Sequence, residues 1–378
     1  MSKTIHLDTS KPWQEQDLGG DRKEIAKKTI CLVRYGAAGD MIQTSALFPI
    51  FKKLGYYICL NTNERGYKII KDDPNVDEFF VQGNDQVDQA ELGDYWWKLH
   101  LLFHKFVNFS ESVEVSLLAK EGRAPAQFWS QKARHRYMNH NYLEFMADIA
   151  DIPYKGENGR FYPTAEEDEW AKKERKKMGK KAKVILWAMS GSSFHKVNFW
   201  VDTVIARTLI HHEEVHFVLT GDDACKYVVG QSWDNEKRVH NWTGGDIRKA
   251  LAFLPYADLV MGPETGVLNA AGGLDEVKKI IFLSHSNPEK VTKYWKNTIN
   301  LEPQNCKCYP CHILHTSNNL CTMVDLREQM TPMIKKEWKE EVYKDILDKP
   351  IRIPLCSLAV SDDMIYSAIN DSLYRELQ

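Results

Sequence analysis

The sequence lacks long apolar runs and any excess of charge of one sign. No stretch approaches the roughly 20 apolar residues that a membrane-spanning helix needs. The net charge of −2 over 378 residues provides no overall electrostatic footprint for nucleic acid or a lipid surface. Residues 1–24 are polar and contain no apolar core of the kind found in a secretory signal. These absences favour a cytoplasmic enzyme.

The cysteines do not have the spacing of a strict double Cys-x-x-Cys site. Four of the eight nevertheless cluster in the sequence: Cys306, Cys308, Cys311 and Cys321. Their spacing allows a structural zinc site of four thiolates, or of three with His312 or His315 as the fourth ligand. The alternative is a cysteine-rich turn that binds no metal. No disulfide framework is expected in a cytoplasmic protein.

The length and the order of elements indicate two α/β domains. A chain of 378 residues exceeds what one hydrophobic core usually carries. Apolar strands such as Thr29–Arg34 alternate with helices, which is typical of a doubly wound parallel sheet. The Gly-, Pro- and Asn-rich stretch Pro153–Pro163 indicates a linker, after which the alternation restarts at Val184. The expected division is a polar arm (1–27), an N-terminal domain (28–160), a C-terminal domain (161–350) and a C-terminal helix region (351–378).

Ligands of such sheets bind at the carboxyl ends of the strands, so the loops there carry the expected site. The loop after Arg34 contains Asp40 at the start of a helix, where the carboxylate serves either as a general base or as a helix cap. The loop after Trp187 contains Lys196, which suits a diphosphate, although it also fits a plain solvent loop. This loop lacks the GxxxxGK[ST] spacing of a Walker loop. Its remaining candidates for phosphate binding are Ser190, Gly191, Ser192 and Ser193.

A third loop follows the short apolar strand Leu259–Met261 and opens a helix at Glu264, Thr265 and Gly266. The free backbone N–H groups at a helix start bind phosphate well, and a carboxylate beside them accepts a sugar hydroxyl. The alternative is an ordinary strand–helix junction with a capping glutamate. Asp223, at a further strand end, suits a ribose or sugar hydroxyl, and a helix cap is the equal alternative. Gly244 belongs to a Gly-rich turn into a helix that is suited to pack beside a nucleoside base.

The order of these loops resembles glycosyltransferase family 9, the heptosyltransferase-like enzymes of GT-B fold. The likeness consists of Arg-x-x-x-x-Gly-Asp at the first turn, a Ser/Gly-rich loop with Lys, Thr-Gly before an Ala-rich helix, and a later Cys-x-x-Cys. It covers about Thr29 to Cys321. The resemblance implies two Rossmann-like domains facing a central cleft, with a C-terminal helix that crosses back to the first domain.

The resemblance also implies the roles of particular residues. Asp40 would be the catalytic base, and Lys196, Thr265 and Gly266 would hold the diphosphate of a nucleotide-sugar donor, ADP-heptose by family default. Two residues depart from the family pattern, because Glu264 replaces an Asp and Asn269 replaces a His. These departures leave a nucleotide-sugar donor in place but put the heptose in question.

The implied reaction inverts the anomeric carbon and requires no metal cofactor. Lys196, the loop amides and the helix dipole at Thr265 would supply the positive charge that the leaving diphosphate needs. The Asp-x-Asp motif of metal-dependent GT-A enzymes is absent.

The first domain is expected to bind the acceptor, a glycan or a lipid-linked molecule. Candidate contacts are Trp96 and Trp97 on one predicted helix and Arg134 and Arg136 in a basic stretch. The alternative is that these are core aromatics and a solvated charged face. Three other functions stay open: glycosyl transfer to a hydroxymethylated nucleic-acid base, nucleotide-sugar binding without catalysis, and nucleotide-sugar epimerisation.

Overall fold

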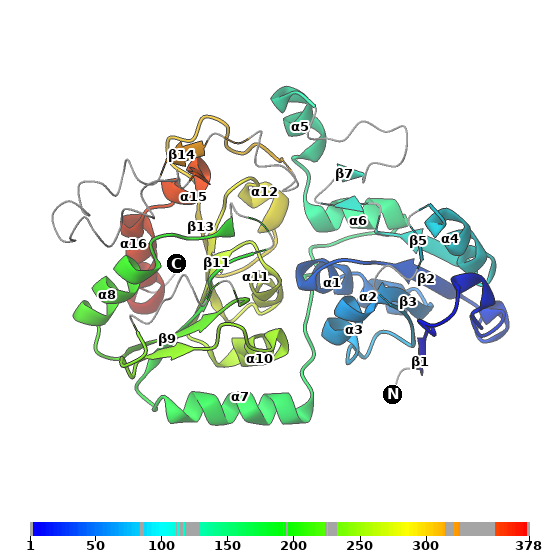
Figure 1. Ribbon diagram of the computed structural model, residues 1–378, viewed down its shortest axis with the longest axis horizontal. Coiled ribbons are helices and arrows are strands. Elements are labelled where there is room, and N and C mark those ends of the chain that lie inside the picture. Colours follow the sequence, from blue (N-terminus) through cyan, green and yellow to red (C-terminus); the bar gives the residue numbers. More distant parts are fainter. Residues whose placement is uncertain are drawn as a thin grey trace.

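The computed structural model describes residues 3–83, 87–88, 90–110, 112–113, 116–117, 129–191, 193, 196–223, 225, 233–313, 321, 323–325 and 352–375. Figure 1 shows two α/β halves side by side, joined by the extended segment between helices α6 (Tyr142–Ala150) and α7 (Ala165–Lys177). No helix within those residues is both long enough and apolar enough to cross a bilayer.

The first half contains a five-stranded parallel sheet in the order β1-β4-β3-β2-β5. Its strands are β1 Lys3–His6, β2 Thr29–Val33, β3 Tyr57–Asn63, β4 Glu78–Gln82 and β5 Lys105–Asn108. Its other helices are α1 Ala38–Ser45, α2 Phe48–Lys53, α3 Glu64–Ile70, α4 Leu92–Leu101 and α5 Gln131–Met138. Strand β2 lies inside this sheet, between β3 and β5, and is buried along its whole length, as expected where a parallel sheet is covered on both faces.

The second half contains a six-stranded parallel sheet in the order β10-β9-β8-β11-β12-β13. Its strands are β8 Lys183–Ala188, β9 Val215–Thr220, β10 Val239–Asn241, β11 Leu259–Pro263, β12 Lys278–Phe282 and β13 Thr298–Leu301. Its helices after α7 are α8 Val201–His211, α10 Ile247–Phe253, α11 Gly266–Gly272, α12 Pro288–Val291, α15 Leu355–Ala359 and α16 Asp362–Tyr374. Two small antiparallel pairs complete the strands, β6 Ser112–Val113 with β7 Ser116–Leu117 and β14 Met323–Asp325 with β15 Arg352–Pro354.

The strand orders place the functional loops at one crevice in each half. Strand β2 lies between β3 and β5, and β8 lies between β9 and β11, so both are points where the chain switches direction across the sheet. Loops at such switch points leave an open crevice at the carboxyl ends of the strands. The alternation of strands and helices, the two parallel sheets and the segment between them confirm the expected fold class.

Residues 3–27 of the polar N-terminal segment pack against the first domain. Strand β1 extends the first sheet by pairing in parallel with β4. Leu7, Trp13 and Leu18 are buried in the same core as Cys31 and Phe80. A few apolar side chains, separated by polar residues, therefore anchor this segment.

The position of the C-terminal helix α16 differs from the expected fold. It was expected to cross back to the first domain, but α16 packs against α8, β12 and β13 of the second domain. Ile365 and Ile369 are buried in the core of that domain beside Leu209 and Ile280. The apolar face of α16 therefore completes the second domain rather than bridging the two.

The two domains meet most closely where α1 faces α11, which lie next to one another in Figure 1. A Cβ atom added to Gly266 would lie 2.8 Å from the Ala38 Cβ, and one added to Gly39 would lie 2.9 Å from the Asn269 Nδ2. Side chains in such close contact do not fit, so the small residues let the two helix starts face one another. The largest hydrophobic core also draws residues from both sheets, for example Leu32 and Leu186.

Lys279 on β12 makes the stability of the fold depend on pH. Its side chain is fully buried, and Nζ donates to the carbonyls of Leu274 and Val277 at 2.7 and 2.6 Å. Burial lowers its pKa to about 8. The pKa in the unfolded chain is about 10.4, so between these values the unfolded state binds more protons and stability rises with pH.

We therefore expect the free energy of unfolding to increase between pH 8 and pH 10 by an amount on the order of 2 kcal/mol more in the wild type than in Lys279→Met. Urea unfolding across this pH range measures the difference. The neighbouring Lys278→Met serves as the control and should keep the wild-type pH dependence. Identical slopes in wild type and Lys279→Met would contradict the prediction.

Candidate functional site

A cavity of about 290 Å³ lies between the two domains at the carboxyl ends of β2, β8 and β11. The first domain contributes Ala37, Ala38, Gly39, Asp40, Gln43 and Tyr142 to its lining. The second domain contributes Ser190, Gly191, Lys196, Ile247, Glu264, Thr265, Gly266 and Asn269. All three predicted loops therefore meet at one cavity.

Asp40 lies in the first turn of α1 and is fixed by three contacts. One carboxylate oxygen pairs with the Arg34 guanidinium, and the other accepts a hydrogen bond from the Ala37 amide at 2.8 Å. The Tyr142 hydroxyl donates to Asp40 at 3.4 Å. Gly36 has a φ of +141°, and a side chain there would overlap the carboxylate. Asp40 therefore both caps its helix and lines the cavity, so the two interpretations of the sequence are compatible.

Arg34 orients that carboxylate from inside the first domain. The guanidinium is buried and donates to the Tyr142 hydroxyl at 2.8 Å as well as to Asp40. Burial lowers the pKa of Arg34, but the neighbouring Tyr142 and Asp40 raise it more, so the net shift is upward. The arginine therefore keeps a fixed positive charge behind Asp40.

Lys196 reaches the cavity from the opposite side. Its side chain is 6% exposed, and Nζ lies 3.7 Å from the Glu264 carboxylate. The His285 Nε2 lies 3.9 Å from the same carboxylate. Gly191 leaves room for the lysine chain, because a Cβ there would lie 2.6 Å from the Lys196 Cδ. A glutamate is one methylene longer than an aspartate, and at position 264 this places the carboxylate near both Lys196 and His285.

The start of α11 provides neutral polar groups to the same cavity. Thr265 caps the helix, and its Oγ1 accepts from the Leu268 amide at 3.3 Å. Asn269 is buried, and its Oδ1 has no hydrogen-bond partner among the residues that the structure describes. An unpaired buried carbonyl oxygen is costly, so this atom is suited to accept a ligand hydroxyl.

Only some of the other residues predicted to bind the nucleotide-sugar donor lie at this cavity. Ser190 lines the cavity and its Oγ lies 3.0 Å from the Cys225 Sγ. The Ser193 Oγ is buried without a partner among the described residues, whereas Ser192 lies outside those residues. Asp223 is exposed in a turn and does not line the cavity.

Gly244 lines a second cavity of about 320 Å³ at the ends of β9 and β10. Trp170, Trp242, Gly245, Asp246 and Lys249 also line it. It lies beside the first cavity, because Asp246 lines one and the next residue, Ile247, lines the other.

The four predicted acceptor residues are not part of the lining of the first cavity. Trp96 is half-buried and donates to the Tyr35 hydroxyl at 3.1 Å, while Trp97 is 62% exposed on the outer side of α4. Arg134 is buried and donates to the Cys311 carbonyl at 2.7 Å. Arg136 stacks over the Tyr137 ring. The role of these four residues toward an acceptor stays a prediction.

The cysteine cluster forms a turn against α5. The Sγ atoms of Cys306 and Cys308 lie 3.5 Å apart. Burial raises the pKa of the Cys311 thiol, and the nearby Cys308 and Cys321 raise it further. Burial and Cys308 raise the pKa of Cys306 to about 12. Within the described part of the chain, no three His, Cys, Asp or Glu side chains are arranged to hold a metal ion. The four cysteines are a donor set that suits zinc, and a structural zinc site stays a prediction.

Sequence reasoning gave no role to four residues at or beside the cavity. Gln43 lies one helical turn after Asp40, so the i+3 spacing could have identified it. Arg34 is the arginine of the Arg-x-x-x-x-Gly-Asp motif, but the motif alone predicted no function for it. Tyr142 and His285 come from segments without a recognisable motif, so only the fold brings them to the site.

No family model matches the sequence, and no curated protein does either. Solved structures are similar in fold. The glycosyl transferase family 9 protein from Veillonella parvula is 15% identical, covers 93% of this chain and 99% of its own, and has a TM-score of 0.62. The ADP-heptose LPS heptosyltransferase II of E. coli is 10% identical, with 92% and 98% covered and a TM-score of 0.58. The iron-containing dodecameric glycosyltransferase TibC of enterotoxigenic E. coli is 11% identical, with 95% and 78% covered and a TM-score of 0.53. The chain therefore has the two-domain, GT-B-like fold of these glycosyltransferases.

Proposed function

We propose that this protein is an inverting glycosyltransferase that moves a sugar from a nucleotide-sugar donor to an acceptor hydroxyl. The observation that carries the proposal is that Asp40 and Lys196 line one cavity from opposite domains. A carboxylate and a cation that face each other across a cavity suit a nucleophile on one side and an anionic leaving group on the other. Fold similarity to known glycosyltransferases supports the same reaction class.

In this reaction Asp40 accepts the proton of the acceptor hydroxyl as that oxygen attacks the anomeric carbon. The bond between this carbon and the diphosphate oxygen breaks, and the electron pair leaves with the nucleoside diphosphate. Attack and departure take place on opposite faces of the sugar, so the configuration inverts. The first domain provides the base, which is consistent with binding of a glycan or lipid-linked acceptor on that side.

The departing diphosphate is stabilised by groups of the second domain. Lys196 supplies a positive charge, and the backbone amides at Gly191 and Gly266 supply hydrogen-bond donors at the same wall of the cavity. These protein groups are the basis for proposing a reaction that needs no metal ion. The nucleoside fits the adjoining cavity, where Gly244 and Gly245 leave room for a base beside Trp242.

The donor class is a nucleotide sugar, with ADP-heptose as the first candidate. TibC is similar in fold and has been solved in complex with ADP-D-β-D-heptose. Glu264 and Asn269 set the sugar selectivity of this chain, because both line the cavity and the buried Asn269 Oδ1 has no partner within the described part of the chain. We place the reaction in the cytoplasm, where nucleotide sugars are made.

A thermal-shift panel of ADP, UDP, GDP and ADP-D-β-D-heptose tests the proposal. A nucleotide that binds the native state at 100 times its Kd stabilises it by about 2.7 kcal/mol, which raises Tm. We expect Lys196→Gln to abolish most of this rise and to lower kcat by about 100-fold, because the leaving diphosphate loses its cation.

The matched control is Lys172→Gln, which removes an exposed lysine paired with Asp168 on α7. This variant should respond to nucleotides as the wild type does. The proposal fails if no nucleotide raises Tm, or if Lys196→Gln and the wild type respond equally.

A further inference from the structure

We infer that Tyr142 is a positioning residue for Asp40, and that Asn141 sets its place through a contact with the second domain. The inference rests on the proposed role of Asp40 as the base. It concerns how docking of the two domains completes the catalytic site.

Tyr142 contacts both members of the ion pair at the base. Its hydroxyl accepts from the Arg34 Nη2 at 2.8 Å and donates to the Asp40 Oδ1 at 3.4 Å. The ring is buried, and the residue lines the cavity together with Asp40. Rotation of the Asp40 carboxylate therefore breaks a contact with Tyr142, and a shift of Tyr142 releases one restraint on the carboxylate.

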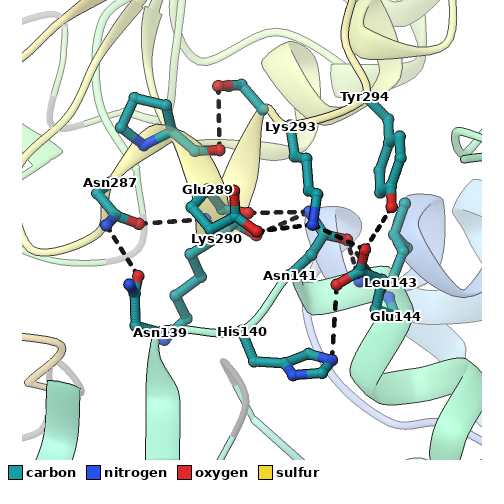
Figure 2. Close-up of polar contacts among 12 residues, drawn as sticks. Asn139, His140, Asn141, Leu143, Glu144, Asn287, Glu289, Lys290, Lys293 and Tyr294 are labelled. Carbon is teal, nitrogen blue, oxygen red and sulfur yellow. Dashed lines mark hydrogen bonds and ion pairs between the residues drawn. The ribbon is translucent and has the colours of Figure 1, made fainter. Parts of the chain in front are cut away.

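Tyr142 is the first residue of α6, and the start of that helix is fixed by Asn141. The Asn141 Oδ1 caps α6 by accepting from the amides of Leu143 and Glu144 at 3.0 and 3.3 Å. Its Nδ2 donates to the carbonyls of Glu289 and Lys290 at 3.2 and 3.3 Å. One buried side chain thus begins a helix of the first domain and ties it to α12 of the second, as Figure 2 shows.

Other polar contacts surround this tie without reaching Tyr142. Asn287 Nδ2 donates to Asn139 Oδ1 at 2.8 Å, and Lys293 Nζ lies 3.0 Å from Glu144 Oε1. The Tyr294 hydroxyl donates to the same carboxylate (Figure 2). The exposed Asn139 contact therefore provides a control that disturbs the domain interface but not the start of α6.

The other end of α12 leads to the donor side of the cavity. Asn287 caps α12 and accepts from the Lys290 amide at 3.1 Å. Two residues earlier, His285 Nε2 lies 3.9 Å from the Glu264 carboxylate, which lines the cavity beside Lys196. Side-chain contacts and short stretches of backbone thus connect Glu264, His285, α12, Asn141, Tyr142 and Asp40 in a continuous series. Because a general base must lie within hydrogen-bond reach of its proton, this series makes the position of the base depend on domain docking.

The test uses variants that remove single contacts from the full-length protein. Asn141→Ser keeps a helix-capping oxygen but is too short to reach the α12 carbonyls. Tyr142→Phe removes only the hydroxyl, and Asn139→Ala is the control. With ADP-D-β-D-heptose as the probe, ADP release gives kcat and the donor KM for each variant and for the double variant Asn141→Ser/Tyr142→Phe.

We expect Asn141→Ser and Tyr142→Phe each to lower kcat by about five- to tenfold, as the loss of one hydrogen bond predicts, with the donor KM unchanged within about twofold. The double variant should be no slower than Tyr142→Phe alone, because Asn141 acts through Tyr142. Asn139→Ala should equal the wild type. Multiplying effects, or wild-type kcat in Asn141→Ser, would overturn the inference.

Hydrogen–deuterium exchange without any ligand provides a readout that does not require turnover. Residues 37–45 should exchange faster in Asn141→Ser and in Tyr142→Phe than in the wild type and Asn139→Ala. Unchanged exchange in both variants overturns the inference even if the protein releases no ADP. If Asp40→Asn keeps full activity, the proposed function fails instead, so the two failures are distinguishable.

Discussion

Asp40→Asn is expected to lower kcat for sugar transfer by about 1,000-fold, because the acceptor oxygen loses the group that removes its proton. Asparagine has nearly the same shape, and its Oδ1 can still accept from the Arg34 guanidinium. The donor binds largely to the second domain, so its KM should change by less than about threefold. Initial rates of nucleoside diphosphate release across donor concentrations measure both parameters.

Two controls separate loss of the base from loss of the fold. Asp94→Asn removes an exposed carboxylate on α4 and should leave kcat unchanged. The nucleotide-induced rise in Tm should persist in Asp40→Asn, because Lys196 and the start of α11 are untouched. Retention of more than about a tenth of wild-type kcat would show that another group accepts the proton.

The part of the site that the sequence predicted follows from the physics of parallel sheets. Apolar strands followed by loops and helices specify both sheets, and strand ends of one sheet lie at one edge. Asp40, Lys196 and Thr265 each lie in the segment that follows such a strand, so their convergence on one cavity could be predicted without coordinates. The small residues Gly39 and Gly266 belong to the same motifs, and the structure explains them by the close approach of α1 and α11.

The part that the sequence did not predict depends on contacts between distant segments. Tyr142 starts a helix that shows only ordinary amphipathic periodicity, and its neighbour Asn141 reads as a routine helix cap. Neither pattern contains information about the α12 carbonyls, which lie almost 150 positions later in the chain. The docking surface of α16 was misjudged for the same reason, since an apolar stripe does not specify which domain it covers.

Arg248 joins the two domains on the side opposite α12 (Figure 1), and its side chain makes more hydrogen bonds than that of Asn141. It is the second residue of α10, and its side chain is 3% exposed. Its guanidinium donates to both oxygens of Glu167 at 2.5 and 2.7 Å and to the Asp72 carboxylate at 2.6 Å. It also donates to the Lys68 and Ile69 carbonyls at the end of α3, at 2.7 and 3.2 Å.

These contacts make Arg248 essential to the docked arrangement. Burial raises the pKa of Glu167, but Arg248 and the hydrogen bonds from Thr164 together lower it more, so the net shift is downward. The ring of Phe161, in the segment between the domains, stacks beneath the guanidinium at 4.7 Å. The Arg248 guanidinium therefore contacts α3 of the first domain, α7 of the second domain and the segment that connects them.

Arg248→Ala should consequently destabilise the protein by about 2–4 kcal/mol, because it leaves two partly buried carboxylates and two helix-end carbonyls without this partner. Urea unfolding followed by tryptophan fluorescence and far-UV circular dichroism measures the loss. The control Arg207→Ala breaks an exposed ion pair with Asp363 and should leave the free energy of unfolding close to that of the wild type. Because α10 also places Ile247 and Asp246 beside the two cavities, Arg248→Ala should weaken nucleotide binding in the same samples. A variant that unfolds within 1 kcal/mol of the wild type would show that the docked arrangement depends on the contacts of α1 with α11 and of α6 with α12 instead.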